Sequence, residues 1–170
     1  MSPSTTQPTK TARPRDQILA IDYGRARIGL AIADTRQGLA QPLATLERVN
    51  RNEDMRRLRE LARDHSVKLV VVGLPLRLDG TRGEMAEEAE RFAQRVRKQI
   101  GVPVEMADER LTSWEAERQL EEQFGRKSKL SDSASKKKLV EKFSVDSMAA
   151  AIILRDYLER TTATSEGAAK

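Results

Sequence analysis

The stretch QILAIDYGRARIGLAIAD, residues 17–34, decides the fold of this chain. Two apolar segments, 17–22 and 28–33, lie on either side of a short glycine-containing turn at 24–27. Such close spacing predicts a β-hairpin. The first segment ends on a carboxylate, Asp22, which the turn would leave at the edge of the sheet. A purely structural alternative is that Asp22 starts an Asx-type turn.

Strands and helices are also predicted along the rest of the chain. The segment KLVVVGL (68–74) is β-branched and uninterrupted, which is typical of a buried strand. Weaker strand patterns occur at 42–47 and 102–107. Helical periodicity is found at 50–65, 83–100, 112–124 and 144–160. Because helices alternate with strands only after an initial meander, we expect an α/β fold with a mixed five-stranded sheet and helices on both faces.

A single domain is expected at residues 17–160, since 170 residues suit one domain. Residues 1–16 are rich in Ser, Thr and Pro, and residues 161–170 read TTATSEGAAK, so both are expected to be disordered tails. No apolar run approaches the ~20 residues that cross a bilayer, and the N-terminus has no apolar signal region. We therefore expect a cytoplasmic protein with no membrane partner.

Composition restricts the chemistry that the chain can perform. It contains no cysteine and one histidine, His65. Disulfides, thiolate zinc sites, cysteine nucleophiles and metal sites with two histidines from one chain are excluded. A metal ion would have to be bound by carboxylate oxygens, which favours Mg²⁺ or Mn²⁺. The formal net charge of +5 weakly favours a polyanionic partner.

Acidic residues at the ends of three predicted elements could bind such an ion. Asp22 ends the first strand, Asp108 and Glu109 follow the fifth, and Asp146 begins the apolar face of the last helix. A buried-facing carboxylate such as Asp146 needs a cation partner. Adjacent residues after a strand point in opposite directions, so only one of Asp108 and Glu109 is expected to face the site. This pattern predicts a divalent-metal site that hydrolyses phosphodiesters.

Basic residues near these acids are candidate phosphate contacts, which give affinity without sequence specificity. Residues 125–143 carry seven basic side chains against two acidic ones, a net charge of +5, and directly precede the helix of Asp146. The alternative is an ordinary solvated loop. The predicted nucleic-acid-binding residues are Arg25, Arg27, Arg110, Lys127, Lys129, Lys136, Lys137, Lys138 and Lys142.

Four segments in order resemble the signatures of the YqgF family, whose members are described as Holliday-junction-resolvase-like proteins or pre-16S rRNA nucleases. They are AIDYGRARIGLAIAD (20–34), VVVGLPLRLDGT (70–81), ADERLTSWEAE (107–117) and VDSMAAAIIL (145–154). The resemblance implies an RNase H-like fold and a metal-dependent nuclease that helps to mature the 5′ end of 16S rRNA. It also implies that Asp22, Glu109 and Asp146 are the catalytic and metal-binding acids. The lysine-rich segment is longer than the connection usual in the family.

The sequence therefore favours a Mg²⁺- or Mn²⁺-dependent nuclease, acting as a monomer or a homodimer. Its expected substrate is structured RNA, above all pre-16S rRNA on ribosomal particles, and Holliday-junction DNA is the alternative. A second class of function is a non-catalytic nucleic-acid-binding module of the same fold. An ATPase related to sugar kinases, which DYGRARIG (22–29) resembles, is disfavoured because those proteins bind nucleotide between two such domains.

Overall fold

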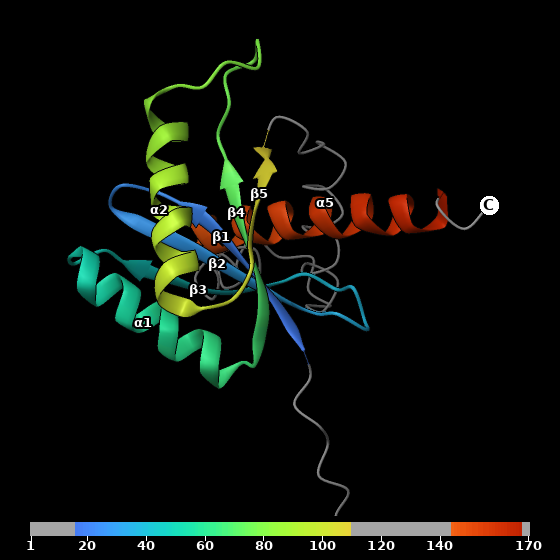
Figure 1. Ribbon diagram of the computed structural model, residues 1–170, viewed down its shortest axis with the longest axis horizontal. Helices are drawn as coiled ribbons and strands as arrows, with labels where there is room; N and C mark the ends of the chain where they lie inside the picture. Colours follow the sequence, from blue (N-terminus) through green and yellow to red (C-terminus); the bar gives the residue numbers. More distant parts are fainter. Residues whose placement is uncertain (1–15, 110–143, 168–170) are drawn as a thin grey trace, which may run out of the picture.

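The computed structural model describes residues 16–109 and 144–167, in which five strands form one mixed sheet (Figure 1). The strand order is β3-β2-β1-β4-β5. Neighbouring strands are antiparallel between β1 and β2 and between β2 and β3, and parallel between β1 and β4 and between β4 and β5. The strands are β1 (Gln17–Tyr23), β2 (Arg27–Asp34), β3 (Gln41–Glu47), β4 (Val67–Leu74) and β5 (Val104–Asp108). The predicted mixed five-stranded sheet is confirmed.

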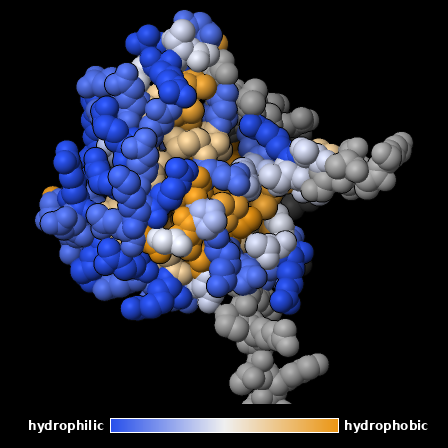
Figure 2. Space-filling view, in the orientation of Figure 1, coloured by the Kyte–Doolittle hydropathy of each residue, from blue (hydrophilic) through white to orange (hydrophobic). Residues whose placement is uncertain are grey.

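Helices cover both faces of this sheet, as predicted. The helices α1 (Arg51–Asp64) and α2 (Glu84–Ile100) lie side by side on one face, and α5 (Val145–Gly167) crosses the other (Figure 1). The outer surface of α1 and α2 is predominantly hydrophilic, and hydrophobic residues show beside them (Figure 2). In the described ranges, 16–109 and 144–167, no helix combines the length and apolar character needed to cross a membrane.

Alternating strand residues build a separate apolar cluster on each face. Leu19 and Ile21 of β1 pack with Phe92 of α2 on the α1–α2 face. On the α5 face the corresponding positions are small: Ala20 and Ala31 pack with Ala150 and Ala151. These small side chains let α5 lie close to the sheet, which brings its first turn, with Asp146, near the end of β1.

Helix α5 continues to Gly167, whereas the sequence predicted an end at Arg160 followed by a tail. The hydroxyl groups of Thr161, Thr162 and Thr164 donate to carbonyls one turn earlier, and no glycine or proline interrupts the helix before Gly167. Asp16, also predicted to be in a tail, accepts a hydrogen bond from the Thr35 N–H at 3.1 Å. The predicted helix at 112–124, the lysine-rich segment 125–143 and residues 1–15 lie outside the described residues.

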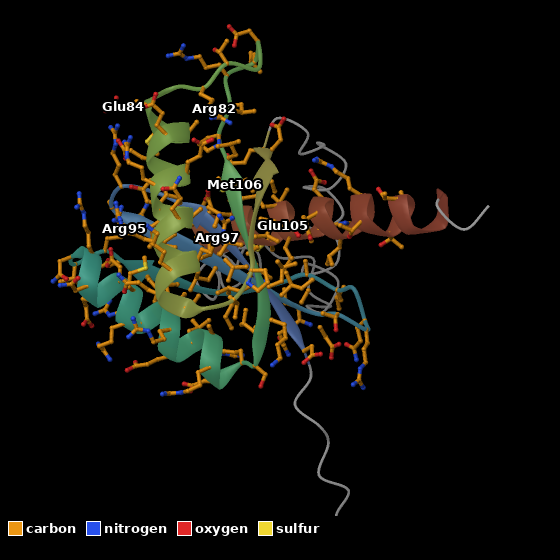
Figure 3. The ribbon with its side chains drawn as sticks, in the orientation of Figure 1. Arg82, Glu84, Arg95, Arg97, Glu105 and Met106 are labelled. Atoms are coloured by element: carbon orange, nitrogen blue, oxygen red, sulfur yellow. The ribbon has the colours of Figure 1, made fainter. Side chains whose placement is uncertain are left out.

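Residues 75–83, which we call the β4–α2 arm, project beyond the end of the sheet (Figure 1). Leu76 and Arg82 form an isolated antiparallel bridge at the base of the arm. Figure 3 labels Arg82 and Glu84 where the arm joins α2. The arm leaves the same edge of the sheet at which the parallel strands β1, β4 and β5 end.

Candidate active site

The predicted acids lie at the edge of the sheet where β1, β4 and β5 end. Asp22 is the penultimate residue of β1, Glu109 directly follows β5, and Asp146 lies in the first turn of α5. Side chains alternate along a strand, so Asp22 shares the α5 face with Ala20. The sheet edge and the first turn of α5 therefore bring these three positions to one place.

Two glycines allow the flanking elements to approach Asp22 from both sides. Gly29 of β2 is the register partner of Asp22, and a Cβ atom at Gly29 would overlap the backbone carbonyl of Asp146. On the other side of β1, a Cβ at Gly73 of β4 would overlap the Glu109 carboxylate and lie 2.7 Å from Ile153 Cδ1. Asp146 thus approaches over β2 and Glu109 over β4, with β1 between them.

Burial and mutual repulsion raise the pKa values of two of these carboxyl groups. The pKa of Asp22 rises to about 6 because the group is desolvated by burial and because Asp146 carries a negative charge nearby. The pKa of Glu109 rises to about 7, mainly through burial and further through the charges of Asp22 and Asp108. Asp22 therefore interacts electrostatically with both Asp146 and Glu109.

The sequence did not decide which of Asp108 and Glu109 faces the site. In the structure Glu109 lies over β4 and interacts electrostatically with Asp22. Asp108 ends β5 opposite Leu74. Both acids line a cavity of about 680 Å³ between β5 and α5, next to the strand on which Figure 3 labels Glu105 and Met106. Glu109 therefore has one side toward Asp22 and the other toward this cavity.

The first turn of α5 is anchored to the sheet by hydroxyl groups. Ser144 accepts a hydrogen bond from the Ser147 N–H at 3.2 Å, the usual geometry of an N-cap. Its hydroxyl also hydrogen-bonds the hydroxyl of Thr45 in β3. Thr45, Gly29 and Asp22 are register partners in one row across three strands. The backbone that carries Asp146 is therefore fixed over this row.

The hairpin turn that carries the two predicted arginines is held in place by ion pairs. Arg27 Nε donates to Asp146 Oδ2 at 2.8 Å, and Arg25 pairs with Glu88 of α2 at 2.8 Å. Both arginine side chains remain more than half exposed, at 57% for Arg25 and 60% for Arg27. Both arginines lie beside the candidate site, and each forms an ion pair with an acidic side chain.

A buried ion pair that sequence reasoning missed supports this turn from below. Arg48 donates to the Gly24 carbonyl at 3.2 Å and to the Tyr23 hydroxyl at 3.0 Å, and its Nε pairs with Asp54 at 3.0 Å. The Asp54 side chain is only 3% exposed. Asp54 lies in the first turn of α1 among apolar residues, so the phase argument used for Asp146 could have found it.

The carboxylates of Asp22, Glu109 and Asp146 are suitable ligands for a divalent ion, although the structure does not arrange all three around one point. Among residues 16–109 and 144–167, no group of three or more His, Cys, Asp or Glu side chains is arranged to hold a metal ion. Asp146 pairs with Arg27 instead. The donors at this edge are carboxylate oxygens, which Mg²⁺ and Mn²⁺ prefer. A cation would stabilise the ionised forms of Asp22 and Glu109 against the burial and the mutual repulsion that raise their pKa values.

The other predicted nucleic-acid contacts lie outside the described residues. They are Arg110, Lys127, Lys129, Lys136, Lys137, Lys138 and Lys142.

The raised pKa values predict that the metal-free protein becomes less stable as the pH rises from about 4 to about 7. In this interval the folded protein still holds protons on Asp22 and Glu109 that the unfolded chain has released, so deprotonation opposes folding. Each group should contribute roughly 1–2 kcal/mol after allowance for screening by solvent. Urea unfolding in chelator at pH 5 and pH 8 measures this loss.

A Glu109→Gln variant isolates the contribution of Glu109 to this pH dependence of stability, because glutamine cannot ionise. Its free energy of unfolding should fall less between pH 5 and pH 8 than that of the wild type. Parallel pH profiles for the two proteins would show that Glu109 ionisation is not linked to folding.

A family model and the most similar known sequences place this chain in the same family. The family described as RuvX, Holliday junction resolvase, matches residues 16–160. A protein from Anaeromyxobacter sp. (strain K) with the name "Putative pre-16S rRNA nuclease" is 44% identical over 142 residues, which cover 84% of this chain and 96% of that protein. A protein of the same name from Koribacter versatilis (strain Ellin345) is 42% identical over 144 residues, covering 85% of this chain and 87% of the relative.

A solved structure shares the fold. The Fowlpox virus resolvase, solved in complex with Holliday junction DNA, superposes with a TM-score of 0.50 at 16% sequence identity. The match covers 85% of this chain and 98% of that one. The RNase H-like fold expected from the sequence is confirmed.

Proposed function

Because the chain belongs to the RuvX (YqgF) family, described as Holliday junction resolvases, we propose that it is a divalent-metal-dependent nuclease that hydrolyses phosphodiester bonds in structured nucleic acid. The observation that carries this proposal is the convergence of Asp22, Glu109 and Asp146 at one edge of the sheet. The raised pKa values of Asp22 and Glu109 support it, since perturbed carboxyl groups are typical of functional sites.

In the proposed mechanism Asp22, Glu109 and Asp146 hold Mg²⁺ or Mn²⁺. The bound ion would supply an activated water and stabilise the leaving oxygen of the phosphodiester. Asp22 lies on the strand between the other two acids, so it is the ligand best placed to act with both. Arg27, which pairs with Asp146 in this structure, and the half-exposed Arg25 would contact the phosphate backbone beside the site.

We propose pre-16S rRNA as the first substrate to test, since relatives that match most of this chain carry that substrate in their names. Such a protein would act in the cytoplasm beside assembling ribosomal particles. Four-way junction DNA is the second candidate, since the family description names it. Arg110 and the lysines of residues 125–143 are proposed as further phosphate contacts because of their charge.

A cleavage assay on both substrates tests this proposal. The full chain is incubated with a pre-16S rRNA 5′-end mimic or with a four-way DNA junction of equal length, in Mg²⁺, in Mn²⁺ or in chelator. We expect cleavage of the RNA at a discrete position, dependent on the divalent ion. Preferential cleavage of the junction would identify the resolvase activity instead. Binding that survives chelation, with no cleavage in either ion, would contradict the proposal and indicate a non-catalytic binding module.

A further inference from the structure

The tip of the β4–α2 arm presents a leucine to solvent. Leu78 is 97% exposed, the highest value among the large exposed hydrophobic residues of the described chain. A fully exposed leucine gains nothing from the hydrophobic effect in the isolated protein. A single exposed leucine needs no functional explanation on its own, so the inference depends on how the arm is built and where it stands.

Hydrogen bonds fix the conformation of the tip. The Gly80 N–H donates to the Arg77 carbonyl at 2.8 Å, and the Arg77 N–H donates to the Thr81 carbonyl at 3.0 Å. The Asp79 carboxylate accepts from both the backbone N–H and the hydroxyl of Thr81, at 2.9 and 2.7 Å. Gly80 takes the left-handed conformation, with φ of 87°, that such a tight turn requires. Leu78 is therefore presented by an ordered turn.

The charges around this leucine suit a polyanion. Arg77 and Arg82 lie on the two sides of the arm, and both are exposed. Arg82 approaches Glu90 at 3.2 Å, with 63% of its side chain still accessible to solvent. The one acid of the arm, Asp79, directs an oxygen toward Thr81 and interacts electrostatically with Arg77, so the two arginines and this acid leave the arm with a net charge of +1. The arm thus offers an apolar tip between two cationic side chains.

The arm begins beside the candidate active site. Pro75 starts it two residues after Gly73, over which the Glu109 carboxylate lies. An extended chain rises about 3.3 Å per residue, so Leu78 stands within about 17 Å of Gly73. Successive nucleotides of one strand are about 3.4 Å apart along a duplex. A nucleic acid strand that runs from a scissile phosphate at Glu109 toward the arm would therefore reach it within about five nucleotides.

We propose that the β4–α2 arm is a contact for the nucleic acid substrate, in which Leu78 inserts at a disrupted base step and Arg77 and Arg82 contact the flanking phosphates. This inference rests on the proposed function and adds to it a preference for branched, bulged or terminal positions. Apolar side chains such as leucine are known to wedge between base steps and unstack them. A protein partner is disfavoured, because one leucine between arginines offers far less apolar area than a specific interface of ~1,200–2,000 Å² needs.

The test replaces Leu78 with alanine, with Leu78→Met as the variant that keeps an apolar tip. Leu39→Ala is the matched control, since Leu39 is an exposed leucine in the β2–β3 connection away from the site. Each substitution is made in the wild type for cleavage and in an Asp22→Asn background for binding. The probe is a branched nucleic acid with 2-aminopurine at the step next to the branch, whose fluorescence rises when that base unstacks.

We expect Leu78→Ala to abolish the fluorescence rise and to lower cleavage of the branched substrate by about tenfold, while Leu78→Met and Leu39→Ala behave as their parents. Equal fluorescence and cleavage for Leu78→Ala and the wild type would overturn the inference. If neither the wild type nor any variant cleaves, but the fluorescence still differs between Leu78→Ala and its parent, the proposed catalytic function fails and the proposed arm contact stands. The two failures are therefore distinguishable.

Discussion

Replacing Asp22 with asparagine is expected to lower the rate of cleavage by about 10³-fold or more. Asp22 lies on the central strand between the elements that carry Glu109 and Asp146, so its charge contributes to any ion held at this edge. Removing one group that stabilises transition-state charge commonly costs 10²–10³-fold, and loss of a metal ligand should cost at least as much. Single-turnover cleavage of the preferred substrate at saturating Mn²⁺ measures the effect.

The same substitution should make the metal-free protein more stable, which distinguishes loss of chemistry from loss of folding. Asparagine has almost the shape of aspartate but no charge, so it removes the repulsion with Asp146 that contributes to the raised pKa of Asp22. Asp16→Asn is the matched control at the opposite end of β1, where the side chain is exposed. A variant that cleaves at the wild-type rate, or that melts below the wild type in chelator, would contradict the assignment.

Replacing Gly29 with alanine is expected to disrupt both folding and activity. The new methyl group would overlap the backbone carbonyl of Asp146, which no rotation of a side chain can relieve. Overpacking a close contact typically costs 1–3 kcal/mol, and a collision with backbone lies at the upper end, so we expect a loss of about 3 kcal/mol. Because the first turn of α5 must move, cleavage should fall even in protein that remains folded.

Gly38→Ala provides the control for this experiment. Gly38 has a positive φ of 62°, and no atom lies within 4 Å of the place that a methyl group would take, so its cost is the ~1–2 kcal/mol of a left-handed residue without any collision. It should lose stability but keep its cleavage rate. Urea unfolding and cleavage at a temperature where all three proteins are folded separate the two effects. Wild-type stability and activity for Gly29→Ala would show that α5 does not rest on this glycine.

Local sequence patterns predicted most of the fold because the strands and helices are locally consistent. The uninterrupted apolar segment 68–74 became β4, and the close pair of apolar segments at 17–34 became the β1–β2 hairpin. The end of α5 was missed because threonine residues neither favour nor prevent a helix strongly. Their hydroxyl groups are satisfied by bonds to the previous turn, which only the structure reveals.

The candidate site could be predicted only where the position of a residue within its element carried information. Asp22 was found at a strand end, and Asp146 by its phase with buried alanines. The local sequence pattern could not distinguish Glu109 from Asp108, because the alternation of side chains gives no orientation once the strand has ended. Contacts between residues distant in sequence were also invisible, among them the Arg27–Asp146 ion pair and the Asp146 carbonyl against Gly29.

The ion pair between Arg27 and Asp146 joins residues 119 positions apart in the chain. Asp22 lies in β1, the first of the described strands, and the helix that completes its surroundings is the last described element. During translation the hairpin can form early, but the site cannot close until α5 has emerged and docked on β2. If the chain is the nuclease proposed, a growing polypeptide in which α5 has not yet docked lacks Asp146 at the site, so we expect it not to cleave the RNA around it.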